Sequence, residues 1–229
     1  MSDPLHRDPL HWRPVATPDG RTLAGRYVVL RSLDPAADAD ALYAESHPPA
    51  ADGIWTYLPY GPFPDVAALR LHLDAQAASA DPLFYAVVPA AQERPAGVVS
   101  YLRITPMHGV IEIGHIWFGA SLARTTAATE TIYLLARHVF DDLGYRRLEW
   151  KCDVLNGRSR AAALRFGFTF EGVFRHHMVI KDRNRDTAWF AITDGEWPSI
   201  RPAYETWLAP ENFDQEGRQR QGLHRLLTR

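Results

Sequence analysis

Two residue types are scarce in this sequence, cysteine and lysine. Cys152 is the single cysteine among 229 residues, so an intramolecular disulfide framework is excluded, and one thiolate alone cannot build a cysteine metal cluster. Lys151 and Lys181 are the only lysines, and arginine supplies the other basic residues. The formal net charge is −2 and charges of both signs are dispersed, which gives no support for a nucleic-acid surface. We expect no metal and no nucleic-acid partner.

Long apolar runs are also missing. No stretch approaches the roughly 18 apolar residues that are needed to span a bilayer. The opening residues MSDPLHRDPLHWRP lack the charged start and the apolar centre of a signal peptide. We therefore expect a cytoplasmic protein without a membrane partner. The hydrophobic content of 46% and the aromatic content of 11% are sufficient for a substantial core, so the chain is expected to be globular.

Hydrophobic periodicity and turn residues predict helices and strands along the whole chain. Two helices come first, the earlier with Asp34 as its cap and Pro35 in its first turn, and the later beginning at Asp65. Three strands with short connections then predict an antiparallel meander. A longer helix follows, with apolar residues at helical spacing from Ala128 to Leu143 and Gly144 in the position of a C-terminal cap.

The order of these elements predicts the fold class. A helix between the fourth and fifth strands implies that these two strands are parallel, because parallel neighbours need a crossover connection. We expect an α/β (α+β) fold with one mixed, mostly antiparallel, seven-stranded sheet and helices on both faces. The expected strands are RYVVLRSL, FYAVVP, AGVVSYLRITP, VIEIGHIWFG, RRLEWKCDV, FTFEGVFRHHMVI and DTAWFAIT.

One domain is expected, since neither a repeat nor a linker divides the chain. Residues 1–24 form an N-terminal extension, in which Asp19–Gly20 is a turn signal for a small hairpin at the sheet edge. The domain itself covers 25–209 and ends with a helix from about Glu196 to Leu208. Residues 210–229 are expected to be a polar and loosely held tail.

Three stretches share a known pattern: IEIGHIWFG, LARTTAATE and NGRSRAAALRFGFTFEGVFR. They resemble the Gcn5-related N-acetyltransferase (GNAT) superfamily, in the branch of the Rim-type ribosomal-protein N-terminal acetyltransferases, and the resemblance covers about Gly25 to Pro198. WTYLPYGPF and DRNRDTAWF are similar to an uncharacterised subgroup of that branch. The resemblance implies a GNAT domain with a splayed central parallel strand pair. The third stretch is the most specific, with matches at Asn156, Ser159, Ala162, Gly167, Phe168, Glu171, Gly172 and Arg175.

The resemblance also implies an activity, the acetyl-CoA-dependent transfer of an acetyl group to a primary amine. The acceptor would be a small molecule or a protein N-terminus, and the amine would attack the thioester directly. A non-catalytic acyl-CoA-binding regulatory protein is the alternative function. The oligomeric state is open, with a homodimer as one option.

The pyrophosphate loop of this superfamily is usually Gln or Arg, two residues, Gly, one residue, and Gly or Ala. Alignment on Glu130 places Ala123, Thr126 and Ala128 at the three key positions, with Arg124 as an alternative source of the first side chain. Backbone N–H groups at a helix start hold a phosphate without any need for glycine. An ordinary helix start is the other interpretation. The expected cofactor contacts here are Ala123, Arg124, Thr125, Thr126, Ala127, Ala128 and Thr129, with hydroxyl donors from Thr125 and Thr129.

Acyl transfer needs a donor for the oxyanion and a hydrogen bond for the departing thiolate. The resemblance points to backbone N–H groups of Ile116, Trp117 and Phe118 as the oxyanion donors, with pantetheine pairing there like an added strand. It also implies that Ser159 donates to the thiolate and that Asn156 holds the pantetheine amide. A plain helix cap at Asn156, with Ser159 in the first turn, is the alternative interpretation.

Two residues are candidates for the general base. Glu112 lies between two isoleucines in an apolar strand, and an exposed, non-catalytic glutamate is its other interpretation. His115 is the alternative base. Strand alternation predicts that Glu112 and His115 point to opposite faces of the sheet, so that they do not share a site.

The acceptor pocket is predicted at the loop that contains Trp55, Tyr57 and Tyr60, because amphipathic rings on a turn-rich loop suit substrate contact. Core packing is the alternative for Trp55. Cys152 is expected to be a buried structural thiol. The charged turn at 183–186 is interpreted mainly as a salt-bridged hairpin formed by Arg183, Arg185 and Asp186, and in the second place as a surface for an anionic acceptor.

Overall fold

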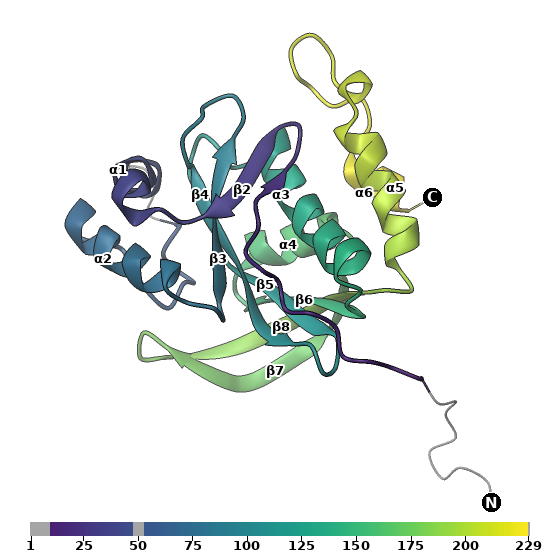
Figure 1. Cartoon of the computed structure of the whole chain (residues 1–229), viewed down its shortest axis with the longest axis horizontal. Helices are drawn as coiled ribbons and strands as arrows, with labels where there is room; N and C mark the ends of the chain where they lie inside the picture. Colours follow the sequence, from purple (N-terminus) through teal and green to yellow (C-terminus); the bar gives the residue numbers. More distant parts are fainter. Residues whose placement is uncertain (1–9, 48–52, 229) are drawn as a thin grey trace, which may run out of the picture.

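The computed structural model describes residues 10–47 and 53–228, and these form one mixed sheet with helices on both of its faces (Figure 1). The sheet has eight strands in the order β1-β2-β3-β4-β5-β6-β8-β7. Only β5 and β6 are parallel; every other neighbouring pair in this sheet is antiparallel. The strands are β1 (Leu23–Ala24), β2 (Val28–Ser32), β3 (Leu83–Pro89), β4 (Gly97–Thr105), β5 (Val110–Phe118), β6 (Arg147–Asp153), β7 (Thr169–Ile180) and β8 (Arg183–Thr193).

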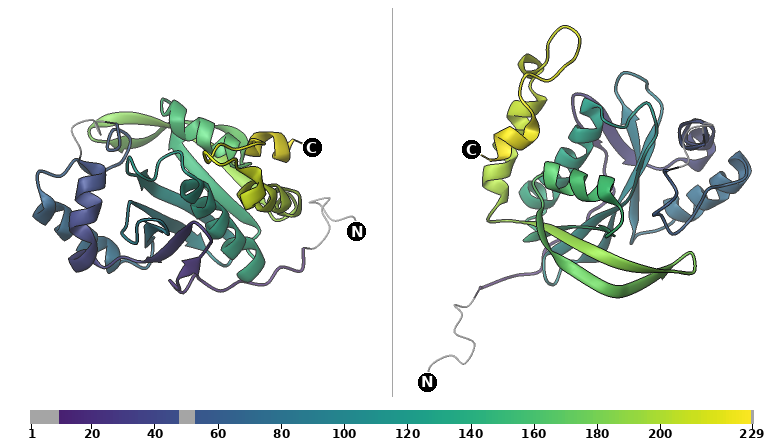
Figure 2. Two further views of the ribbon diagram at one scale, coloured as in Figure 1. Left: turned by 90° about the horizontal axis from the view of Figure 1, so that it is seen from above. Right: turned by 180° about the vertical axis from the view of Figure 1, so that it is seen from behind.

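The helices form two layers with the sheet between them (Figure 2). One layer contains α1 (Pro35–Ser46) and α2 (Val66–Ala77); the other contains α3 (Thr126–Arg137), α4 (Gly157–Arg165) and α5 (Trp197–Leu208). A π-helical turn, His138–Asp142, extends α3, and a short helix α6 (Leu223–Leu227) packs near α5. Each layer has its own apolar cluster against the sheet. No helix in the described part of the chain is long and apolar enough to cross a membrane.

The local signals in the sequence predicted these elements well. Asp34 caps α1 and Asp65 caps α2, each through its side chain, and Pro35 is the first residue of α1. Gly144 has a φ of 73° after the π-helical turn, as a C-terminal cap requires. The meander and the parallel β5–β6 pair are confirmed, and the sheet contains one strand more than the seven that were predicted.

The predicted turn of the N-terminal hairpin is wrong. Strands β1 and β2 pair through the turn at residues 25–27, and not through Asp19–Gly20. The carboxylate of Glu130, on α3, accepts hydrogen bonds from the backbone N–H groups of Arg26 (2.9 Å), Tyr27 (2.6 Å) and Val28 (3.0 Å). A Cβ atom at Gly25 would overlap that carboxylate. A buried glutamate from a distant helix therefore selects the turn, and local sequence signals do not contain this information.

The C-terminal tail is ordered, which corrects the expectation of a loosely held segment. The Trp207 indole donates to Gln219 (2.7 Å), and the Asn212 side-chain amide donates to the Trp207 carbonyl (3.0 Å). Leu223 is 1% exposed and belongs to the main apolar cluster. Polar residues therefore tie the tail to the end of α5, and Leu223 of α6 anchors it in the core. Figure 1 shows α6 beside α5.

Candidate active site

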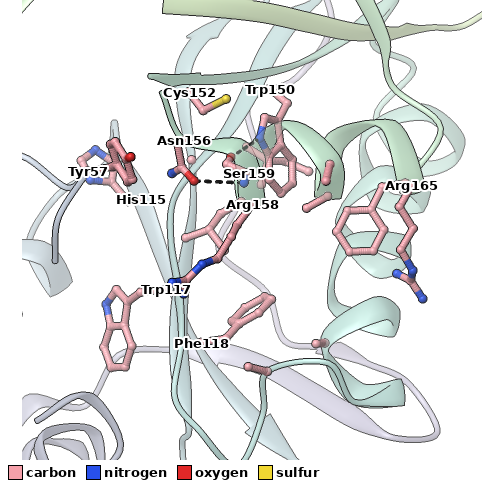
Figure 3. Close-up of a pocket in the computed structure, with 18 of the residues that line it drawn as sticks. Tyr57, His115, Trp117, Phe118, Trp150, Cys152, Asn156, Arg158, Ser159 and Arg165 are labelled. Carbon is pink, nitrogen blue, oxygen red and sulfur yellow. Dashed lines mark hydrogen bonds between the residues drawn. The ribbon is translucent and has the colours of Figure 1, made fainter. Parts of the chain in front are cut away.

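A cleft of about 1750 Å³ opens where β5 and β6 separate (Figure 3). The parallel register ends at the pair Ile113 and Trp150, whereas β5 continues to pair with β4 as far as Phe118. The predicted splay of the central parallel strands is therefore present. Residues 116–118, the predicted backbone donors, lie on the part of β5 beyond that last pair and line the cleft.

The start of α3 forms another part of the cleft wall. Thr125 is the N-cap: its hydroxyl accepts from the Ala128 N–H (3.2 Å) and donates to the Leu122 carbonyl (2.7 Å). The N–H groups of Thr126 and Ala127 lie in the first turn, where a helix has no carbonyl partner for them. The Thr125 hydroxyl thus stabilises the helix rather than serving as a free phosphate donor, and the backbone supplies the available N–H groups.

The glycine-poor loop before α3 contains one left-handed residue, and it is Arg124, with a φ of 66°. Thr126, the residue aligned with the first glycine of the usual pattern, is already helical, so it needs no glycine there. Thr129 is 2% exposed, and its hydroxyl accepts from the Arg165 guanidinium (3.1 Å). This contact leaves the hydroxyl proton of Thr129 for another acceptor, so a contact of Thr129 with a phosphate stays a prediction, and the Arg165 guanidinium lies beside the helix start.

The start of α4 brings three predicted residues together (Figure 3). Asn156 caps the helix by accepting from the Ser159 N–H (3.0 Å), and the Ser159 hydroxyl accepts from the Trp150 indole (2.9 Å). Cys152 is buried, as predicted. Burial raises the pKa of the Cys152 thiol, and its hydrogen bond with Ser159 acts in the opposite direction. The Ser159 hydroxyl is thus held at the cleft wall between the Trp150 indole and the Cys152 thiol.

Glu112 lies in a network of charges on the sheet face below α1 and α2. Its side chain is buried and forms ion pairs with Arg103 and with Lys151 (3.0 Å). Lys151 also pairs with Glu149 (2.7 Å) and lies 3.8 Å from the centroid of the Trp189 ring. Glu112 is therefore not the exposed strand glutamate that one interpretation predicted. Two cations bind its carboxylate, which reduces its availability as a proton acceptor.

The predicted placement of Glu112 and His115 on opposite faces is wrong. Three steps along β5, from Gly114 to Trp117, match two steps along β4, from Ser100 to Val98, so β5 contains a β-bulge. His115 has a φ of 50° within this bulge. The extra residue resets the alternation of side chains. His115 and Glu112 consequently lie on the same face and line the same cleft.

His115 lies in an aromatic environment. Its Nδ1 atom is 3.2 Å from the hydroxyl of Tyr60, and the two rings are stacked at 5.6 Å. The Phe84 ring lies on another side at 5.3 Å. Burial, with smaller contributions from the positive charges of Arg103 and His72, lowers the pKa of His115 from its usual 6.5 to about 4. The imidazole is therefore neutral at pH 7.

Of the three predicted acceptor-pocket residues, only Tyr57 lines the cleft. Its hydroxyl donates to the Leu155 carbonyl (3.0 Å). Trp55 is 4% exposed and its indole donates to the Ser46 carbonyl (3.1 Å), so it packs in the core. Tyr60 lies behind the wall, against His115. The structure thus assigns Trp55 to core packing and Tyr60 to support of His115.

The residues predicted as a charged turn, 183–186, lie at the start of β8, and the turn itself is at residues 181–182. They form no salt bridge within the described residues. The Asp186 carboxylate accepts from the His176 N–H (2.7 Å) and from the side-chain amide of Asn184 (2.9 Å) instead of pairing with an arginine. Arg183 is exposed to solvent, whereas Arg185 lines the cleft. The prediction of a salt-bridged hairpin is therefore wrong, and only one of the two arginines faces the site.

Some residues that line the cleft were not predicted from the sequence. Arg158 and Arg165 of α4 line the cleft, as do Phe213 and residues 217–219 of the C-terminal tail. The sequence contained a signal that the tail packs against the domain, namely the two aromatic residues Trp207 and Phe213. In the structure their rings pack edge to face at 5.3 Å. Two aromatic residues at the start of a polar tail indicate that it docks.

A splayed parallel strand pair beside the start of a helix is the arrangement that the resemblance to the coenzyme A-dependent GNAT acyltransferases implied. Comparison with known proteins agrees with this class. Residues 28–169 match the model of the Acetyltransferase (GNAT) domain family, and the chain belongs to that family. Acetyl-CoA-dependent acetylation is the activity of this family.

Individual relatives have the same fold. A crystal structure of a GCN5-related N-acetyltransferase from Brucella melitensis is 46% identical, covers 96% of this chain and 99% of its own, and has a TM-score of 0.94. The microcin C7 self-immunity acetyltransferase MccE, in complex with acetyl-CoA and AMP, is 22% identical, covers 74% of this chain and 93% of its own, and has a TM-score of 0.65.

A curated relative shares a shorter segment. The ribosomal-protein-serine acetyltransferase of Escherichia coli (strain K12) is 32% identical over 95 residues, which is 42% of this chain and 52% of that protein. The chain therefore spans about half the length of the curated relative that it matches.

Proposed function

We propose that this protein transfers the acetyl group of acetyl-coenzyme A to the primary amine of a small molecule or of a protein N-terminus. The observation that supports this most directly is the separation of β5 from β6 beside the free N–H groups of α3, in one cleft that continues to His115 and Tyr57. The part around residues 116–118, the starts of α3 and α4, and Arg165 is called the donor half. The part around Arg103, Glu112, His115, Lys151 and Arg185 is called the acceptor half.

The donor half fits acetyl-coenzyme A, which supplies the acetyl thioester when it is bound. The Thr126 and Ala127 N–H groups, at the positive end of the α3 dipole, would bind the pyrophosphate. Residues 116–118 would pair with pantetheine and stabilise negative charge on the acetyl carbonyl oxygen through their N–H groups. Asn156 caps α4 and can contact the pantetheine amide at the same time.

His115 is the proposed proton acceptor for the attacking amine. When Nδ1–H donates to the Tyr60 oxygen, the neutral ring leaves Nε2 with a free lone pair. Glu112 is less suitable for this role, since Arg103 and Lys151 bind its carboxylate. The role of Glu112 in this proposal is to hold those two cations, so that they do not repel the incoming amine.

Ser159 would donate its hydroxyl proton in a hydrogen bond to the departing thiolate. The Trp150 indole donates to the same hydroxyl oxygen and orients it, and the hydroxyl proton, which contacts the Cys152 thiol in the free protein, would turn to the thiolate. A serine hydroxyl is a weak acid, so its contribution is a hydrogen bond rather than full proton transfer.

A thiol-release assay tests the proposed function. The protein is incubated with acetyl-coenzyme A and a panel of amino acids, peptides, polyamines and aminoglycosides, and free coenzyme A is measured. Release that depends on an acceptor, with an acetylated product found by mass spectrometry, is the expected result. Saturable binding of coenzyme A without release for any acceptor would instead support the alternative of a non-catalytic acyl-CoA-binding regulator.

A further inference from the structure

The charged side chains that line the cleft are mostly positive, although the whole chain has a net charge of −2. Seven cationic residues line it, against two acidic ones. This excess is local, so it indicates what the cleft binds. The cationic residues are Arg103, Arg124, Lys151, Arg158, Arg165, Arg185 and Arg218, and the acidic ones are Glu112 and Asp153.

The phosphates of coenzyme A account for only part of this excess. Arg124, Arg158 and Arg165 lie near the starts of α3 and α4 or on α4 itself, in the donor half. The acceptor half has its own cations, Arg103 and Lys151, and both are paired with Glu112. Arg218, on the C-terminal tail, pairs with Asp214 (2.9 Å) and Glu216 (3.0 Å). The one cation that these groups leave unexplained is Arg185, the third of the acceptor half.

Arg185 is held in place but has no counter-ion. Its Nε–H donates to the Thr187 hydroxyl (3.2 Å), and Thr187 is fully buried and also contacts Nδ1 of His177 (2.9 Å). Within the described residues, Arg185 forms no ion pair. Burial lowers the pKa of its guanidinium, an effect that the neighbouring carboxylate of Asp153 only partly offsets. A fixed and partly desolvated guanidinium is therefore presented to the cleft.

Neighbouring groups do not satisfy this charge. Asp186, the next residue, accepts hydrogen bonds from His176 and Asn184. Asp153 accepts from the Leu155 N–H (2.8 Å). A half-buried cation without a partner is unfavourable, and the planar guanidinium fork suits the bidentate binding of a carboxylate or a phosphate.

We propose that Arg185 binds an anionic group of the acetyl acceptor, so that the substrate class is an amine that carries a carboxylate or a phosphate. This inference rests on the proposed function, because it assigns the acceptor of the same site. Polycationic acceptors, such as polyamines and aminoglycosides, are expected to be poor substrates, since Glu112 is already neutralised and would not compensate their charge.

The first test compares matched acceptors, of which one member of each pair carries an anionic group and the other does not. The pairs are an amino acid and its amide, phosphoethanolamine and ethanolamine, and two peptide amides with Asp or Asn as the second residue. For wild type, kcat/KM is expected to be about 10-fold to 100-fold higher for the anionic member of at least one pair. The pair that shows this preference identifies the anion as a free carboxylate, a phosphate or an acidic side chain.

The variant Arg185→Gln should abolish that preference and leave the affinity for coenzyme A unchanged. Arg183→Gln is the matched control, because it removes the same charge from an exposed position two residues away on the same strand. It should retain the preference. Equal rates for both members of every pair in the wild type, or a preference that survives in Arg185→Gln, would overturn the inference.

A second test does not depend on turnover. With coenzyme A present at saturation, calorimetry measures the binding of two matched product pairs: N-acetylglycine with its neutral amide, and N-acetylphosphoethanolamine with N-acetylethanolamine. In at least one pair, preferential binding of the anion by wild type and Arg183→Gln, but not by Arg185→Gln, is expected. Equal binding within both pairs, or no binding of any of the four probes, contradicts the inference. Absence of thiol release for every acceptor contradicts the proposed function instead, so the two failures are distinguishable.

Discussion

The two halves of the cleft use different parts of the chain for their chemistry. In the proposed function, the donor half relies mainly on backbone groups: the N–H groups of Thr126 and Ala127 and those N–H groups of residues 116–118 that face away from β4. The acceptor half relies on side chains, of which His115 and Arg185 lie on different strands, β5 and β8. Figure 3 shows the two regions apart, with His115 and Tyr57 on one side and Arg165 on the other.

This difference explains why a glycine-poor loop is compatible with the family fold. Every residue except proline supplies an N–H group, so the donor half tolerates substitutions that keep the backbone path. The acceptor half has no such tolerance, because each of its roles belongs to one side chain. Substitutions in the acceptor half should therefore change the reaction of the acceptor, and substitutions in the donor half should change the affinity for coenzyme A. The largest effect is expected for the side chain that is proposed to accept the proton.

The largest effect is expected for His115→Gln, which removes the proposed proton acceptor. The value of kcat should fall by about 100-fold, the usual scale for loss of a general base. The affinity for coenzyme A should stay within about twofold, since His115 lies in the acceptor half. Thiol-release assays at saturating acetyl-coenzyme A measure kcat, and calorimetry measures the affinity for coenzyme A.

Two further variants support the interpretation of that result. Glu112→Gln keeps the shape of the other candidate base, and it should lower kcat less than His115→Gln does. Tyr60→Phe removes only the hydroxyl that contacts Nδ1 of His115 (3.2 Å) and should give an intermediate loss. A larger loss of kcat for Glu112→Gln than for His115→Gln would assign the base to Glu112.

The next effect is expected in the donor half, for Thr126→Pro. This change deletes one free N–H group at the first position of α3, where proline is well tolerated. Thr125 has a φ of −90° and a ψ of 170°, which suits a residue before proline. The affinity for coenzyme A should fall by about 10-fold, for the loss of one charge-assisted hydrogen bond.

Thr126→Ala is the matched control, because it removes the hydroxyl and keeps the N–H group. Its coenzyme A affinity, measured by calorimetry, should equal that of wild type. If Thr126→Ala weakens binding as much as Thr126→Pro does, the side chain and not the backbone holds the phosphate. The description of the donor half as a backbone site would then be wrong.

The same contrast shows what the sequence could and could not predict. Caps, turns and the crossover rule were sufficient for the helices and for the parallel pair, because these signals are local or topological. The acceptor face depends on two β-bulges, at His115 in β5 and at Arg103 in β4, where φ is positive for both residues. A bulge reverses the alternation of side chains, and the one signal for it in IEIGHIWFG is Gly114 in the interior of the strand, which the strict alternation used for Glu112 and His115 did not take into account.

Long-range contacts account for the other differences. Glu130 selects the β1–β2 turn from a helix about a hundred residues away in sequence, and Asp186 binds a backbone N–H of β7 rather than the neighbouring arginines. In both cases a carboxylate accepts a hydrogen bond from a backbone N–H group of another element, a contact that the local sequence does not indicate. For Asp186, the sequence alone favours the neighbouring arginines as partners, and this is why a salt-bridged hairpin was predicted.

A smaller effect concerns stability and pH. The folded chain holds His115 with a pKa of about 4, below its usual 6.5, so the unfolded chain binds a proton at a higher pH than the folded chain does. Stability is therefore fully present above about pH 6.5 and decreases as the pH falls towards 4. His47 and His72, whose pKa values burial also lowers, act in the same direction.

Urea unfolding at pH 7 and at pH 5 measures this contribution. Between these values His115→Gln should lose less stability than wild type, by about 1 kcal/mol after allowance for partial solvent screening. Protonation of the carboxylates affects both proteins alike and cancels in the difference. An identical pH dependence for the two proteins would show that His115 is not buried in its neutral form.

The smallest effect is expected for Arg165→Gln, the donor-half counterpart of Arg185→Gln. Arg165 also lacks an acidic partner within the described residues, and burial lowers the pKa of its guanidinium. It differs from Arg185 because it lies beside the α3 N–H groups, so it adds to an anion site that the backbone already provides. We expect coenzyme A affinity to fall by about threefold, most visibly at low ionic strength, and the acceptor KM to stay unchanged.

The matched control is Arg160→Gln, because Arg160 is an exposed arginine on the same helix. Equal losses of coenzyme A affinity for both variants would indicate a general charge effect instead of a contact at the helix start.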